Sequence, residues 1–164
     1  MKQATVGFVN GCYDLLHDGH VAMLTECAQN CDHLIVAVNS DRYCTAKKGK
    51  DRPIDPWWVR ASKIHQVLTE LREASFAIIP FEGDDQGLLM HIRPDILFKG
   101  YDHSALPLFY RKIGWKKLPG DVPAFQGPKI HQCQHLPGFS TTAIVEQQNA
   151  EAQRLVSDAQ DLPR

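Results

Sequence analysis

The segment that most constrains the fold is residues 11–20, GCYDLLHDGH, which lies between an apolar run and a helical pattern. The run before it, residues 6–9, predicts a buried strand, and Val21, Leu24 and Ala28 have the spacing of one helix face. A strand, a glycine turn and a helix start are therefore expected in succession. Unpaired backbone N–H groups and the positive end of the helix dipole favour an anion at such a place.

Two histidines lie at this expected helix start. His17 and His20 are three residues apart, and Gly19 leaves room for a ligand to approach closely. Imidazole N–H groups placed there can donate to a phosphate and stabilise the charge that grows during a displacement at phosphorus. A histidine pair near a helix start is also compatible with surface polarity or a simple N-cap, so the pair alone does not establish a function.

The rest of the chain alternates between strand and helix patterns. Helical spacing of apolar residues covers 59–71 and 84–93, and further strands are expected at 34–38, 76–79, 96–99 and, with a more polar composition, 130–136. This alternation predicts an α/β fold, a doubly wound five-stranded parallel sheet with helices on both faces. Ligands of such sheets bind beyond the carboxyl ends of the strands where the strand order reverses. Gly11 and Gly100 each come at the end of an expected strand.

Length and charge narrow the function further. The 164 residues fit one domain spanning 1–164, with an irregular segment rich in proline and glycine at 103–129 and a C-terminal helix or tail at 147–164. A formal net charge of -1 gives no support to a nucleic-acid or membrane-surface role. No apolar segment is long enough to cross a bilayer, and the first residues do not resemble a signal peptide. A cytoplasmic protein is expected.

The five cysteines are an odd number without the spacing of a disulfide framework, which predicts free thiols. Cys27 and Cys31 are one helical turn apart and His33 follows closely, which is compatible with a zinc site. Structural zinc usually takes four ligands with paired spacing, and the sequence shows no second pair. Buried thiols are the better interpretation, and no metal ligand is predicted.

Residues 11–20 resemble the G-x-F-D-x-x-H-x-G-H motif of the cytidylyltransferase-like nucleotidyltransferases, and only Tyr13 in place of phenylalanine departs from it. The resemblance extends from Phe8 to about Glu146 and implies a Rossmann-like fold. Residues 138–142, GFSTT, are similar to the G-x-S-T-T segment of that family, whose hydroxyls and backbone amides hold the β- and γ-phosphates. By themselves, hydroxyls at a helix start usually only cap the helix.

The resemblance implies roles for particular residues. His17, His20 and Lys48 would be catalytic, although the sequence does not decide between Lys47 and Lys48 as the phosphate clamp. The implied nucleotide contacts are Gly11, Cys12, Tyr13, Asp14, Gly19, Lys47, Arg60, Gly100, Asp102, Gly138, Phe139, Ser140, Thr141 and Thr142. Without the resemblance, the lysines would be a solvated surface run, Arg60 one half of an intrahelical ion pair, and residues 99–102 an ordinary turn after a strand.

Residues 48–49 (KG) and 52–54 (RPI) look like the branch that adenylylates heptose 1-phosphate. This implies transfer of AMP from ATP to a sugar 1-phosphate with release of pyrophosphate, and Mg²⁺ is expected on the β/γ oxygens. The alternatives are a cytidylyltransferase that uses CTP and glycerol 3-phosphate or another polyol phosphate, and a non-catalytic nucleotide-binding regulator. A homodimer is implied by the resemblance alone.

Two departures from the family pattern affect the expected site. Residues 135–139, HLPGF, stand where glycerol-3-phosphate cytidylyltransferases tend to have Arg-Thr-Glu-Gly-Ile, so an arginine contact to the triphosphate is missing or replaced, with His135 at that place. The 103–129 segment is longer than is usual for the family and carries Trp115, Lys116 and Lys117 where acceptor recognition would be decided. A different acceptor is therefore among the expectations.

Overall fold

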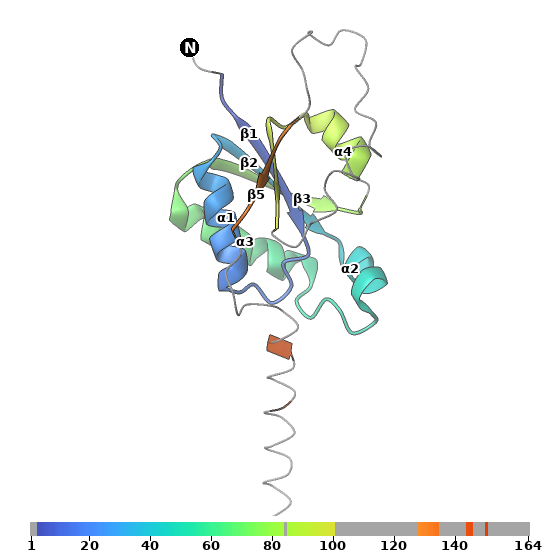
Figure 1. Ribbon diagram of the computed structural model, residues 1–164. Coiled ribbons are helices and arrows are strands. Elements are labelled where there is room, and N and C mark those ends of the chain that lie inside the picture. The colour runs from blue at the N-terminus through green and yellow to red at the C-terminus, as the bar shows by residue number, and fades with distance from the viewer. Residues whose placement is uncertain (1–2, 84, 101–127, 135–143, 146–149, 151–164) are drawn as a thin grey trace, which may run out of the picture.

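The computed structural model describes residues 3–83, 85–100, 128–134, 144–145 and 150. Five parallel strands form one sheet in the order β3-β2-β1-β4-β5 (Figure 1). The strands are β1 (Val6–Gly11), β2 (His33–Asn39), β3 (Ser75–Phe81), β4 (Ile96–Lys99) and β5 (Lys129–Gln132). The helices are α1 (Asp18–Gln29), α2 (Asp41–Lys48), α3 (Trp57–Leu71) and α4 (Asp85–Ile92).

The central strand β1 fixes the position of the sequence motif. It pairs along its whole length with β2, from Val6 opposite His33 to Gly11 opposite Val38, and on its other side with β4. The chain builds β2 and β3 on one side of β1 and then returns to the other side for β4 and β5, so the strand order reverses between β1 and β4. The predicted parallel sheet is confirmed, with its switch point at the carboxyl ends of these two strands.

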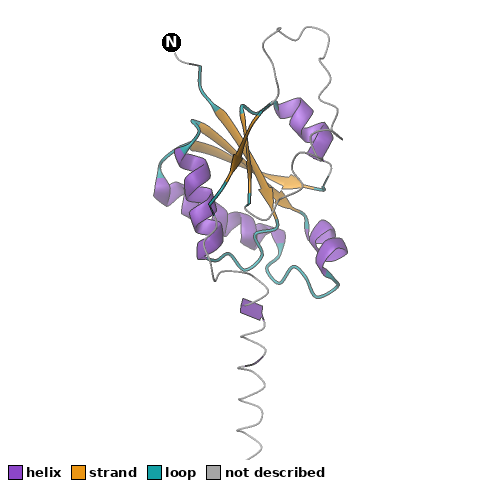
Figure 2. Ribbon diagram, in the orientation of Figure 1, coloured by secondary structure: helices purple, strands orange, loops and turns teal. Residues whose placement is uncertain are grey.

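Helices lie on both sides of the sheet (Figure 2), and an apolar layer lies on each of its faces. Alternation along β1 sends Val9 into the layer with α1 and α3, where Leu24 and Ile64 are fully buried. Phe8 points into the opposite layer, which it shares with Leu89 of α4. Helices on both faces explain why β1 and β2 are apolar at successive positions rather than at every second one.

The sequence does not predict the helix α2, because its residues lack the apolar spacing of a helix face. Ser40 caps this helix by accepting a hydrogen bond from the Tyr43 amide at 3.1 Å. Its one buried residue is Cys44, so the sequence carries no apolar periodicity over this stretch. Lys47 and Lys48 therefore belong to the last turn of a helix rather than to a loop.

The remaining boundaries differ slightly from expectation. The strand β5 begins at Lys129, one residue earlier than predicted, and ends at Gln132. The expected irregular segment lies outside the described residues except for its last two positions, and of the predicted terminal helix only residues 144–145 and 150 are described, all helical. Among the described helices, none has the length and apolar character needed to cross a membrane.

Candidate nucleotide site

The site is built where β1 and β4 end side by side. Gly11 is the last residue of β1, and Gly100 directly follows β4. A carbon added at Gly11 would lie 3.0 Å from the Tyr13 ring, so the close turn leaves no room for a side chain. The Nζ of Lys99 donates to Oδ1 of Asn10 at 2.7 Å and ties the two strand ends together. Sequence reasoning missed this pair, although a buried lysine closing an apolar strand is itself a signal.

The histidine pair lies at the start of α1. His17 is the N-cap residue with φ -131° and ψ 171°, and its side chain makes no capping hydrogen bond. Its carbonyl oxygen instead accepts from the amides of His20 at 2.8 Å and Val21 at 3.1 Å. The two imidazole rings are stacked, with centroids 3.8 Å apart and planes 20° from parallel. The simple alternative, an imidazole that caps its own helix, is not what the structure shows.

Burial disfavours the charged form of both imidazoles. It lowers the pKa of His20 to about 3, with further contributions from His17 and from Lys48. Burial also lowers the pKa of His17, and the charge of Lys48 acts in the same direction. The Nδ1 atom of His20 is buried without a hydrogen-bond partner among the described residues. Neutral imidazoles can donate a hydrogen bond to an anion without first taking up a proton.

The sequence does not decide whether Lys47 or Lys48 is the phosphate clamp, and the structure places the two lysines differently. Lys48 lies near enough to lower the pKa of His17, His20 and Cys12 through its charge. Lys47, by contrast, places its Nζ over the ring of Tyr43, 5.7 Å from the centroid. Lys48 is therefore the lysine that the fold brings to the histidines.

Asp14 is engaged by protein groups rather than presented to a ligand. Its buried carboxylate accepts hydrogen bonds from the amides of Ile54 at 3.0 Å and Asp55 at 2.9 Å and from Nε of Arg52 at 2.6 Å. Burial raises the pKa of Asp14, but these hydrogen bonds and the Arg52 charge outweigh it and leave the pKa below its usual value. These contacts attach the motif to the loop before α3, and the expected contact of Asp14 with the nucleotide stays a prediction. Sequence reasoning missed Arg52 as its partner.

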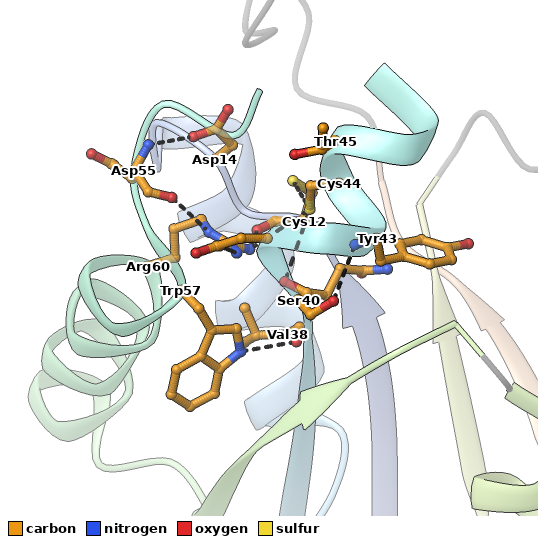
Figure 3. Close-up of polar contacts among 12 residues, drawn as sticks. Cys12, Asp14, Val38, Ser40, Tyr43, Cys44, Thr45, Asp55, Trp57 and Arg60 are labelled. Carbon is orange, nitrogen blue, oxygen red and sulfur yellow. Dashed lines mark hydrogen bonds and ion pairs between the residues drawn. The ribbon is translucent and has the colours of Figure 1, made fainter. Parts of the chain in front are cut away.

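Arg60 is likewise buried and bound to protein groups (Figure 3). Its Nε donates to the carbonyl of Asp55 at 2.9 Å and its Nη1 to the carbonyl of Cys12 at 2.5 Å, while Nη2 pairs with Asp41 at 2.5 Å. The guanidinium thus joins the motif, the start of α2 and the turn before α3. Arg60 therefore holds these segments together, and its expected contact with the nucleotide stays a prediction.

Cys12 and Cys44 form a close thiol pair beside Arg60, with their Sγ atoms 2.7 Å apart (Figure 3). The hydrogen bond from Cys44 lowers the pKa of Cys12 to about 6 against the effect of burial, and the charges of Lys48 and Arg60 lower it further. The same contact raises the pKa of Cys44. The directions of the two pKa shifts make Cys12 the more acidic thiol of the pair.

The other expected contacts are divided between described and undescribed parts of the chain. Gly19 lies in the first turn of α1, and the Tyr13 ring is packed in the core with its backbone at φ 54°. Six expected contacts lie outside the described residues and stay predictions: Asp102, Gly138, Phe139, Ser140, Thr141 and Thr142.

A parallel sheet whose switch point carries a glycine turn, two hydrogen-bond donors at a helix start and a nearby lysine defines an α/β protein that binds phosphorylated nucleotides. The model of a family described as Cytidylyltransferase-like matches residues 8–147. The chain belongs to this family, and the expected nucleotidyltransferase domain is confirmed at that level.

Several curated relatives bear the name "Bifunctional protein HldE". That of Granulibacter bethesdensis is 38% identical over 143 residues, covering 87% of this chain and 27% of the relative. That of Acidiphilium cryptum is 36% identical over 140 residues, covering 85% of this chain and 26% of the relative. The chain thus spans about a quarter of the length of these relatives.

Solved structures agree with the fold. The lipopolysaccharide core biosynthesis protein from Thermoplasma volcanium GSS1 is 27% identical with a TM-score of 0.59, covering 82% of this chain and 99% of that one. A pantoate-beta-alanine ligase from Francisella tularensis has a TM-score of 0.54 at 17% identity, covering 88% of this chain and 69% of that one. The second likeness concerns the fold alone.

Proposed function

We propose that this domain transfers AMP from ATP to a sugar 1-phosphate of the heptose 1-phosphate kind and releases pyrophosphate. The observation that carries the proposal is the stacked pair His17 and His20, uncharged and close to Lys48, at the switch point of the sheet. Donors placed there face the position at which a nucleotide binds in sheets of this topology.

In the proposed reaction, a phosphate oxygen of the acceptor attacks the α-phosphorus in line. A new P–O bond forms to the acceptor, the bond to the bridging α–β oxygen breaks, and pyrophosphate leaves with that electron pair. The acceptor phosphate is ionised at neutral pH, so no protein base is required, and catalysis consists of positioning and charge stabilisation. His17 and His20 donate hydrogen bonds to the α-phosphate, and the Lys48 ammonium offsets charge on the phosphates.

Mg²⁺ fits this chemistry as part of the nucleotide substrate. Asp14, the carboxylate within the motif, is already bound by Arg52 and by two backbone amides. We therefore propose that the divalent ion arrives on the β- and γ-phosphate oxygens, as magnesium commonly does. Bound there, it neutralises charge on the leaving pyrophosphate.

The choice of ATP and of a sugar phosphate rests on two kinds of support. Residues 48–49 and 52–54 resemble heptose 1-phosphate adenylyltransferases, and the curated relatives reported above share the name HldE. A relative of known structure is described as a lipopolysaccharide core biosynthesis protein. CTP with glycerol 3-phosphate is the competing pair of substrates, and a regulator that binds nucleotide without turnover is the competing class.

The test is pyrophosphate release, measured for each nucleoside triphosphate against a panel of sugar and polyol phosphates. ATP with a sugar 1-phosphate should give the fastest release. His20→Ala should lower turnover by about 10²–10³, because it removes a donor to the transition state. His65→Ala is the matched control, since His65 is an exposed imidazole of α3.

Two outcomes would reject the proposal. If His20→Ala turns over as fast as the control variant, His20 does not contribute to the chemical step. Tight binding of ATP without pyrophosphate release in any combination would identify a regulator instead.

A further inference from the structure

A second cluster of reactive side chains lies at the other end of α1. Glu26 and Cys27 are consecutive in its last turn, whereas His131 belongs to β5 and Cys133 directly follows that strand. Ligand atoms of Glu26, His131 and Cys133 all lie within 4.8 Å of one another. The Sγ of Cys27 lies 3.8 Å from the Sγ of Cys133, and both thiols are buried. The cluster thus joins two segments about a hundred residues apart in sequence.

Part of this arrangement is explained without a ligand. Oε1 of Glu26 lies 2.6 Å from Nε2 of His131, and Oε2 of Glu26 accepts from the amide of Gln134 at 2.8 Å. The His131 ring also packs against Phe98, with centroids 5.2 Å apart. These contacts attach α1 to β5, but they involve neither thiol.

The inner side of the cluster holds a polar atom that these contacts leave unsatisfied. The hydroxyl of Tyr13 is fully buried and has no hydrogen-bond partner among the described residues. Its ring belongs to the same buried cluster as Cys27 and Cys133. A buried hydroxyl costs free energy unless it finds an acceptor, and a thiolate is one.

The spacing of the two sulfur atoms fits one metal ion. Two thiolates bound at about 2.3 Å to a tetrahedral zinc ion lie about 3.8 Å apart. An imidazole nitrogen and a carboxylate oxygen, each at about 2.0–2.2 Å, complete the tetrahedral donor sets that zinc prefers. The Glu26 and His131 atoms need to separate by less than about 1 Å to share such an ion. Cys27 does not belong to the group whose ligand atoms all lie within 4.8 Å of one another, so its Sγ must also move toward Glu26 and His131 while it stays close to Cys133. The Glu26 and His131 side chains are about three-quarters buried, at 23% and 25% exposed, and can make this adjustment.

We propose that Cys27, Cys133, His131 and Glu26 bind one Zn²⁺ ion, through Sγ, Sγ, Nε2 and Oε1. Binding replaces two S–H bonds by two Zn–S bonds and releases two protons to solvent, and no atom changes its oxidation state. The Tyr13 hydroxyl then donates to a sulfur. The ion fixes the end of α1 to β5, and α1 is the helix whose start carries the histidine pair. The site is structural, because four protein ligands leave no open position.

The sequence predicts no metal ligand, and of the three residues whose spacing is compatible with zinc, Cys27, Cys31 and His33, only Cys27 belongs to the proposed site. Cys31 donates its thiol to the carbonyl of Cys27 at 3.2 Å. Nδ1 of His33 is hydrogen-bonded to the hydroxyl of Ser75. Neither residue belongs to the cluster, so the second pair of ligands comes from β5 and not from the neighbouring sequence.

Metal binding to the reduced, chelator-stripped protein tests this proposal. Zn²⁺ is titrated against a chromophoric chelator, and Co²⁺ is used as a spectroscopic probe of thiolate ligation and tetrahedral geometry. One equivalent should bind. Cys133→Ser should weaken zinc binding at least about a hundredfold, since even residues that only orient metal ligands commonly contribute 10- to 100-fold. Cys27→Ser should also reduce the thiolate-to-cobalt absorption.

Two controls separate this site from the other thiols. Cys31→Ser removes a buried thiol one turn from Cys27, and Cys44→Ser removes one member of the other close thiol pair. Both variants should bind zinc as the unmodified protein does. Circular dichroism establishes that each variant is folded. Glu26→Gln and His131→Gln, at partly exposed positions, test the two remaining ligands and should each bind zinc at least about tenfold more weakly.

The proposal fails if no equivalent of zinc binds. It also fails if Cys44→Ser abolishes binding while Cys133→Ser does not, or if folded Cys133→Ser binds zinc as tightly as the Cys31→Ser control. Unchanged binding by Cys27→Ser, Glu26→Gln or His131→Gln would overturn the four-ligand site. These measurements do not depend on nucleotide turnover.

Discussion

Replacing Arg60 by methionine should reveal how strongly one buried guanidinium stabilises the nucleotide site. The side chain is fully buried and donates hydrogen bonds to the carbonyls of Cys12 and Asp55 and to the carboxylate of Asp41. Asp41 is 48% exposed, so water replaces its lost partner and this ion pair contributes at most about 1 kcal/mol. Each carbonyl loses a hydrogen bond from a charged donor, typically about 1.5–3 kcal/mol. The methionine side chain recovers about 1 kcal/mol through apolar burial.

The free energy of unfolding of Arg60→Met should therefore fall by about 2–6 kcal/mol, measured by urea denaturation. Arg60→Lys should recover only part of this loss, because an ammonium keeps the charge but cannot reach three acceptors in a fork. Arg42→Met is the control: the Arg42–Glu82 pair is 84% and 56% exposed, so its loss should leave the free energy of unfolding nearly unchanged. An Arg60→Met protein as stable as this control, but weak in ATP binding, would refute the positioning role and restore a direct phosphate contact.

Two further predictions concern the same loop. Asp14→Asn should lower the free energy of unfolding by about 2–3 kcal/mol at pH 7, since it weakens charged hydrogen bonds at a buried site. Because folding holds the pKa of Asp14 below its usual value, this difference should be present above about pH 4 and be lost as the pH falls through the folded-state pKa; a pH-independent difference would contradict the argument. Cys12, with a pKa lowered to about 6, should react with iodoacetamide at neutral pH before the four other cysteines, as followed by peptide mass spectrometry. Its rate should be half-maximal near pH 6, and equal labelling of all five thiols would contradict this order of acidity.

The sequence was sufficient where local patterns dominate. Four strands were predicted within two residues at each end, because apolar runs that are buried on both faces read directly as strands of a parallel sheet. The place of Gly11 at the end of β1, beside β4, followed from topology rules that need no coordinates. The sequence pattern did not predict the helix α2, because this helix is stabilised by a cap and one buried thiol rather than by an apolar face.

The roles of Asp14 and Arg60 could not be predicted in the same way. Each has the charge expected of a residue that contacts a nucleotide or its metal ion. In the folded chain, backbone groups of the loop between α2 and α3 bind both of these side chains, which residue type alone does not predict. The meeting of Cys27 with Cys133 depends on β5 lying beside β4 in the sheet, which no short-range spacing encodes. Contacts of this kind are set by tertiary structure, so residue type gives their chemistry but not their partners.

The two sides of the candidate site belong to elements that differ in how much of their surface is packed against the rest of the protein. The histidine pair follows β1, a central strand anchored in both apolar layers, through Phe8 on one side and Val9 on the other. Lys48 ends a short helix that buries a single side chain, so its position can change with little loss of packed surface. A nucleotide entering between them would meet immobile hydrogen-bond donors on one flank and an adjustable positive charge on the other. Closure around the phosphates would then come from the α2 side.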